Sequence, residues 1–191
     1  MKLLFATLLM VFGPAAFGAW NLDPTRSQIS FVSIKAQSVA EVHRFTEVSG
    51  RISADGIATL TIQLASVDTL IPIRDQRMRE TLFRTDLFPT ATVLTSLDLK
   101  ALDSLAPGST LEIATEVVLN FQDRELPFTA ELLVSRLSAR RVVAATLKPI
   151  IVNAANLGLT DGIEALREVA GLPSISSAVP VSVVLTFNRA P

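Results

Sequence analysis

Residues 67–88, VDTLIPIRDQRMRETLFRTDLF, interrupt a chain that otherwise alternates apolar and polar side chains. A threonine and a proline mark the end of a strand, and charged residues then crowd the segment. The spacing of Arg74, Met78 and Leu82 suits a short helix whose apolar stripe packs on a sheet. A solvated helix with intrahelical ion pairs fits the same composition. Either way, a helix is predicted in the middle of a β-rich chain.

Strand-like alternation on both sides of this segment predicts about eight strands separated by turns. The clearest strand comes just before the segment, where Leu60, Ile62 and Leu64 alternate with polar residues. The expected strands cover residues 28–35, 45–53, 58–64, 91–99, 111–119, 128–134, 142–147 and 179–187. Residues 36–44 are polar and mixed, so they are expected to connect two strands.

A second short helix is predicted at residues 162–170, because Thr160 and Asp161 supply N-cap side chains and Gly171 supplies a stop signal. The chain is therefore predicted to form an all-β domain, an eight-stranded antiparallel up-and-down barrel with two short helices. A two-sheet sandwich fits the same strand count. The barrel is favoured because closure buries strand edges that so apolar a sheet would otherwise expose.

The first residues have the pattern of a secretory signal. Lys2 gives a positive start, an apolar run follows, and small residues supply a cleavage site, so we expect a signal peptide at residues 1–18 and the domain at 19–191. A retained membrane anchor is the alternative, but the apolar run is shorter than the roughly 20 residues of a spanning helix. The sequence therefore predicts an exported protein.

The composition excludes several classes of function. A net charge of −1 gives no basis for nucleic-acid binding. The chain has no cysteine and a single histidine, His43, which is a poor basis for a metal site. The carboxylates that could form a catalytic pair are Asp23, Glu41, Asp75 and Glu80. The sequence does not show that any two of them converge. The sequence thus predicts a protein that is not an enzyme and uses no metal and no cofactor.

Two stretches of the chain carry motifs of a known family. The matching residues are Trp20, Leu22, Asp23 and Ser27 at the start, and Val67-Asp68-Thr69, Arg74-Asp75, Met78-Arg79, Leu82-Phe83 and Pro89-Thr90-Ala91-Thr92 further on. These motifs resemble the YceI-like family, small bacterial secreted proteins with a lipocalin-like barrel that holds polyisoprenoid lipids. The chain departs from the family pattern at Arg26, residues 76–78 and Val93, where the family has a histidine, an x-His-Leu run and an aromatic residue.

The resemblance implies a periplasmic carrier of a polyisoprenoid lipid, of the isoprenoid quinone or prenyl pyrophosphate type. A mean hydropathy of +0.46 agrees with a barrel that has apolar surface to spare. The side chains expected to bind the ligand are Phe31, Leu60, Ile62, Leu64, Arg74, Met78, Arg79, Phe83, Val117, Leu119, Val183 and Leu185. Arg74 and Arg79 are expected to meet its head group. Alternatively, Arg74 pairs with Asp75 and docks the helix over the barrel end. Trp20 is expected to plug one end of the barrel.

The competing function is a periplasmic interaction module with a filled core, associated with membrane electron transfer or stress response. Large side chains at every inward position would favour the module. A tunnel would instead require small inward side chains, for which the candidates are Ala58, Ala114, Ala130 and Ala145. The implied partners are a polyisoprenoid lipid or quinone and a membrane cytochrome, and a homodimer is left open.

Overall fold

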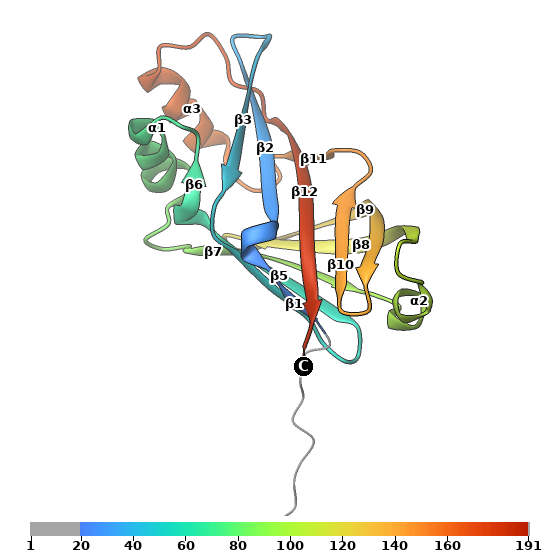
Figure 1. Cartoon of the computed structure of the whole chain (residues 1–191). Coiled ribbons are helices and arrows are strands. Elements are labelled where there is room, and N and C mark those ends of the chain that lie inside the picture. Colours follow the sequence, from blue (N-terminus) through green and yellow to red (C-terminus); the bar gives the residue numbers. More distant parts are fainter. Residues whose placement is uncertain (1–19, 191) are drawn as a thin grey trace, which may run out of the picture.

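The computed structural model describes residues 20–190 (Figure 1). The expected signal peptide and the domain start at residue 19 lie outside the described residues. The described strands are β1 (Trp20–Leu22), β2 (Gln28–Lys35), β3 (Val39–Phe45), β4 (Val48–Ile52), β5 (Ile57–Gln63), β6 (Val67–Asp68), β7 (Thr90–Ser96), β8 (Thr110–Phe121), β9 (Arg124–Ser138), β10 (Arg141–Thr146), β11 (Ile150–Asn153) and β12 (Ala178–Arg189). The helical segments are η1 (Pro24–Arg26), η2 (Leu64–Ser66), α1 (Pro72–Arg77), the π-helix η3 (Met78–Phe83), α2 (Leu99–Ser104) and α3 (Thr160–Val169).

The strands close into an antiparallel barrel, as predicted. Pairing runs β1-β4-β5-β7-β8-β9-β10-β12, and β12 pairs with β1 to complete the ring. The alternative two-sheet sandwich is therefore wrong. β2 and β3 extend the wall beyond this ring, because β12 pairs with β1 through residues 187–189 and with β2 through residues 181–184. The wall thus reaches further at the end where α1 and α3 lie (Figure 1).

The prediction that residues 36–44 only connect two strands is wrong, since β3 occupies Val39–Phe45 and pairs with β2 along its whole length. A three-residue turn, residues 36–38, joins the two strands, with Ala36 and Gln37 both at positive φ. The helical pattern also differs, because the strand expected to reach residue 99 ends at Ser96 and a third short helix, α2, follows.

The helix at residues 160–169 begins differently from its sequence signal. Its N-cap residue is Leu159 and no side chain caps it, so Thr160 and Asp161 lie in the first turn. Gly171 does end the helix, at φ +61°, with its N–H donating to the carbonyl of Glu168 at 3.0 Å. Such a left-handed residue after the last turn is a common helix stop.

One end of the barrel is filled by Trp20, which is 1% exposed. The guanidinium carbons of Arg136 and Arg189 each lie 5.4 Å from its ring centroid, so the indole packs against two cations. Nearby, Gly50 in β4 lets the chain pass close to β5, because a Cβ there would lie 2.9 Å from the carbonyl oxygen of Thr59. These contacts hold the strands together at the end away from α1 and α3 (Figure 1).

Candidate ligand-binding cavity

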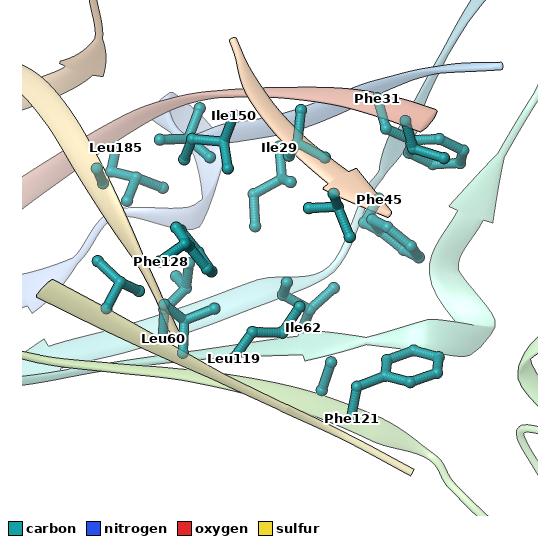
Figure 2. Close-up of a pocket in the computed structure, with 18 of the residues that line it drawn as sticks. Ile29, Phe31, Phe45, Leu60, Ile62, Leu119, Phe121, Phe128, Ile150 and Leu185 are labelled. Carbon is teal, nitrogen blue, oxygen red and sulfur yellow. The ribbon is translucent and has the colours of Figure 1, made fainter. Parts of the chain in front are cut away.

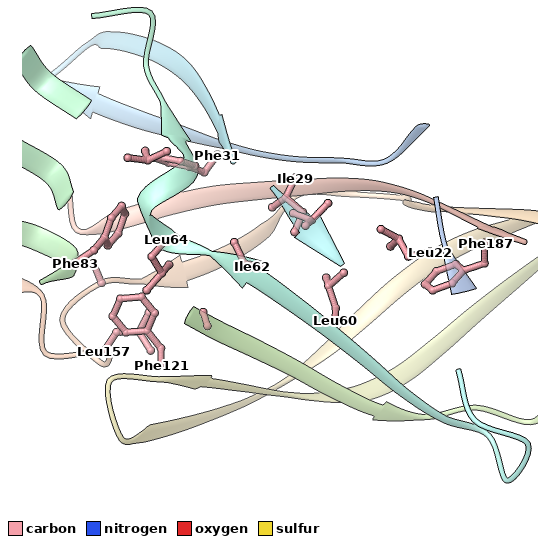
Figure 3. Close-up of a cluster of buried hydrophobic side chains, with 14 of the residues drawn as sticks. Leu22, Ile29, Phe31, Leu60, Ile62, Leu64, Phe83, Phe121, Leu157 and Phe187 are labelled. Atoms are coloured by element: carbon pink, nitrogen blue, oxygen red, sulfur yellow. The ribbon is translucent and has the colours of Figure 1, made fainter. Parts of the chain in front are cut away.

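The interior of the barrel contains a cavity of about 670 Å³. Apolar side chains from β2 and from most strands of the ring point into it, as Figure 2 shows for Ile29, Leu60, Leu119, Phe128 and Leu185. The buried core residues, several of which Figure 3 labels, form the wall around this space. The volume lies within the range of roughly 300–1,000 Å³ that is typical of sites for small molecules.

The structure places eleven of the twelve residues predicted to bind the ligand on the cavity wall. They are Phe31, Leu60, Ile62, Leu64, Arg74, Met78, Phe83, Val117, Leu119, Val183 and Leu185. Arg79 does not line the cavity, whereas Arg77 does. Ligand contact by these residues stays a prediction.

Small side chains widen the cavity. Ala58 and Ala130 line it, as the tunnel hypothesis requires, whereas Ala114 borders it but is exposed on the outer face of β8. Ala145 does not line it, and its neighbour Ala144 takes the inward position instead. Ala144 pairs with Leu185 of β12 in the sheet register, and both residues face the interior. The filled core of the alternative hypothesis is therefore not what these strands build.

Four phenylalanines form a continuous row along one part of the wall. Ring centroids are 5.4 Å apart for Phe31 and Phe45, 5.8 Å for Phe45 and Phe83, and 6.1 Å for Phe83 and Phe121. Figure 3 shows Phe31, Phe83 and Phe121 around this part of the core. Aromatic pairs at these separations stabilise each other beyond the area they bury. Sequence reasoning missed Phe45 and Phe121 as lining residues, although both carry the strand alternation.

The wall made by β2 and β3 becomes more polar toward the hairpin tip. Directly opposed residues on two antiparallel strands share a face. Along the inner face the opposed pairs are Ile29 with Phe45, Phe31 with His43, Ser33 with Glu41, and Lys35 with Val39. An apolar interior therefore passes into a charged region at the end that carries α1 and α3.

His43, the only histidine, lies within this gradient and is 3% exposed. Its Nε2 is 2.7 Å from the hydroxyl oxygen of Ser33, and its Nδ1 has no hydrogen-bond partner among the described residues. Burial lowers the pKa of His43, and the nearby Arg74 guanidinium lowers it further. The imidazole ring of His43 is therefore neutral at pH 7. No carboxylate orients Nδ1, so the pair lacks the third member of a Ser-His-Asp arrangement.

Arg74 docks α1 onto the barrel, but through Thr69 and Glu41 and not through the expected partner Asp75. Its Nε donates to the hydroxyl of Thr69 at 2.8 Å, its Nη2 donates to the carbonyl of Thr69 at 2.8 Å, and its Nη1 pairs with Glu41. Asp75 does not pair with Arg74 but accepts from the backbone N–H of Thr69 at 2.9 Å. The proposed Arg74–Asp75 pair is therefore wrong, because both side chains converge on Thr69.

Glu41 links this cluster to the hairpin. Lys35 lies 2.9 Å from its carboxylate, and Arg74 contacts the other oxygen. The bonds from Lys35 and then Arg74 hold the pKa of Glu41 below its ordinary value. Arg77 also lines the cavity and makes no ion pair or side-chain hydrogen bond with the described residues. This end of the cavity therefore presents an excess of donors and positive charge.

The described residues contain no group of three or more His, Cys, Asp or Glu side chains that could hold a metal ion. Within residues 20–190, no helix has the length and apolar character needed to cross a membrane. The chemistry that the cavity offers is thus an apolar space with hydrogen-bond donors at one end.

Comparisons with known proteins agree with this geometry. A family model described as a YceI-like domain matches residues 20–187. The solved structure of a polyisoprenoid binding domain from Saccharophagus degradans, implicated in plant cell wall breakdown, is 40% identical with a TM-score of 0.89, covering 91% of this chain and 99% of that chain. No curated protein matches the chain.

Two more distant structures share the fold. BcnA from Burkholderia cenocepacia is 20% identical with a TM-score of 0.64, covering 86% of this chain and 98% of that chain. The YCEI protein of Campylobacter jejuni is 11% identical with a TM-score of 0.58, covering 78% of this chain and 85% of that chain. At these identities the likeness concerns the fold alone.

Proposed function

The chain belongs to the YceI-like domain family, and we propose that it binds a polyisoprenoid lipid inside its barrel. The observation that carries this proposal is the apolar cavity of about 670 Å³. Burial of a prenyl chain there would gain about 0.8 kcal/mol for each CH₂ group removed from water, less the cost of ordering the chain. The 40% identical domain from Saccharophagus degradans, which is named a polyisoprenoid binding domain, supports the same ligand class.

The polar end of the cavity suits a head group rich in acceptor oxygens. Lys35, Arg74 and Arg77 line this region, and Glu41 and Asp75 are the carboxylates beside them. A quinone carbonyl or a pyrophosphate accepts hydrogen bonds from such donors. We therefore propose an isoprenoid quinone or a prenyl pyrophosphate as the cargo, with its head group at this end and its tail among the phenylalanines.

Binding without catalysis agrees with the side chains on the wall. The Ser33–His43 pair has no carboxylate on Nδ1, and the polar groups near it are bound to one another. The periplasm as location, a membrane cytochrome as partner and a homodimer stay predictions from the sequence and from the family resemblance.

Native mass spectrometry of protein purified without detergent tests the proposal. We expect an added mass of prenyl-lipid size, which organic extraction removes and which a prenyl quinone added to the extracted protein restores. A bare chain that also fails to take up added prenyl quinone and prenyl pyrophosphate would contradict the proposed function. It would favour an interaction module that leaves its cavity empty.

A further inference from the structure

Exposed apolar side chains gather where the chain enters α1. Leu70 is 81% exposed, Ile71 43% and Ile73 53%. We call these three residues the rim patch. A soluble protein normally keeps such residues covered when they lie next to one another.

The loop holds Leu70 outward through fixed contacts. Leu70 adopts φ +62°, a left-handed conformation that leucine seldom takes. On one side its own N–H donates to the carboxylate of Asp68 at 3.0 Å, and on the other the buried Thr69 is bound by Asp75 and Arg74. The loop is therefore built to present a large apolar side chain to its surroundings.

The rim patch is continuous with the interior of the barrel. Ile71 and Ile73 are both exposed and both line the cavity. Leu172 and Ile175, which follow α3, line the cavity as well, and Lys35 lines it at the tip of the β2–β3 hairpin. Figure 1 shows α1, α3 and this hairpin at the same end of the molecule. An apolar path thus leads from the cavity to the outer surface.

The patch fits a lipid surface better than a protein partner. A stable protein interface covers roughly 800 Å² on each side, far more than three side chains on one loop provide. Amphipathic segments that carry apolar side chains beside basic ones instead bury their apolar face at the boundary between head groups and acyl chains. Arg77, which makes no ion pair with the described residues, stands next to the patch and is complementary to lipid phosphates.

We propose that the rim patch inserts into a phospholipid bilayer, so that a prenyl lipid passes between membrane and cavity without crossing water. This inference rests on the proposed function and adds the surface through which the cargo travels.

The test measures transfer of a pyrene-labelled prenyl chain from the protein to vesicles of phosphatidylcholine and phosphatidylglycerol that contain a quencher lipid. Insertion predicts a transfer rate that rises in proportion to vesicle concentration. Leu70→Asn should lower the rate about tenfold, because it removes the most exposed apolar side chain, and asparagine tolerates the left-handed backbone. Leu70→Met should transfer like the wild type.

Leu137 supplies a matched control. It is 57% exposed but follows Arg136, whose side chain binds the carbonyl of Leu102 in α2 at the opposite end of the molecule (Figure 1). Leu137→Asn should leave the transfer rate unchanged. Since Leu70 does not line the cavity, the affinity of Leu70→Asn for the probe in vesicle-free buffer should also stay at the wild-type value.

A transfer rate independent of vesicle concentration, or equal in wild type and Leu70→Asn, would overturn bilayer insertion and leave the proposed function intact. Failure of the wild type to bind the probe would instead remove the proposed function. Insertion can then still be tested by sedimentation with vesicles. Sedimentation of the wild type and of Leu137→Asn, but not of Leu70→Asn, would support insertion. Equal sedimentation of all three proteins would overturn it.

Discussion

The Nε2 atom of His43 and the hydroxyl oxygen of Ser33 lie 2.7 Å apart in the inner wall, while the Nδ1 atom of the same ring is left without a partner among the described residues. A buried N–H without an acceptor costs more than a bare lone pair, so the proton belongs on Nε2. Ser33 then accepts from the histidine and keeps its own O–H free. The neutral ring of His43 therefore fixes the orientation of the Ser33 hydroxyl, whose O–H remains available to donate a hydrogen bond.

Acidification should destabilise the protein through His43. The folded state holds its pKa down through burial and Arg74, so the unfolded chain binds a proton more readily. The contribution of His43 to the free energy of unfolding is therefore fully present above the ordinary histidine pKa of about 6.5. It is lost as the pH falls from that value toward the folded pKa, with a slope of at most about 1.4 kcal/mol per pH unit. Urea unfolding at pH 8, 7, 6 and 5 measures it.

His43→Gln is the control for this slope, since glutamine can still donate to Ser33 and the chain has no other histidine. The variant should show a flat free energy of unfolding between pH 7 and 5. Carboxylates with lowered pKa, such as Glu41, lose their contribution only below about pH 4.5, outside this window. An unchanged slope in the variant would refute the assignment to His43.

Arg74→Ala should lower the free energy of unfolding by about 2 to 4 kcal/mol. The change removes three hydrogen bonds from a guanidinium that joins α1 to Thr69 and Glu41. Arg79→Ala, which removes a side chain that does not line the cavity, should stay within about 0.5 kcal/mol of the wild type. Equal effects of the two substitutions, measured by denaturant titration, would argue against the docking role of Arg74.

Arg77→Ala should weaken binding of a prenyl pyrophosphate about tenfold while leaving the affinity for a prenyl alcohol of the same length within twofold. The guanidinium lines the cavity and makes no ion pair with the described residues, so its removal costs the fold little. Isothermal titration calorimetry with both ligands measures the difference. A similar loss for the alcohol would show that Arg77 acts on the tail or on the shape of the cavity.

Ala144→Phe should weaken binding of the prenyl tail at least thirtyfold but change the free energy of unfolding by less than about 1 kcal/mol, because the new ring enters empty space and does not overpack a core. Ala145→Phe, on the opposite face of β10, is the matched control and should bind like the wild type. A destabilisation of several kcal/mol in Ala144→Phe would indicate that the interior is closed in solution.

The strands that the sequence predicted are those whose apolar residues face inward, such as Leu60 and Ile62 in β5. β3 was not predicted because its pattern of polar and apolar residues is inverted. Glu41 and His43 lie on the inner face, and Val42 is 67% exposed. Glu41 is tolerated there because Lys35 and Arg74 neutralise it, and Arg74 lies 33 residues away. A pairing at that separation leaves no mark in local periodicity.

The candidate site was predictable to a similar degree. Alternation along a strand determines which residues face the interior, so the lining positions in β5, β8 and β12 followed from the sequence. Arg79 was chosen from the clustering of arginines and from the family pattern. In the α-helix α1, the residues three and four positions after Arg74 share its face, and these are Arg77 and Met78, which both line the cavity. Arg79 lies five positions after Arg74 and therefore off that face.

The change from apolar to charged side chains along β2 and β3 determines how an amphipathic ligand would be oriented in the cavity. A prenyl lipid of the proposed kind would lie with its chain beside Ile29 and Phe45 and with its polar group beside Lys35 and Glu41. Under the proposed function, the polar group would therefore stand nearest the opening, where a receiving surface meets it before the hydrocarbon chain.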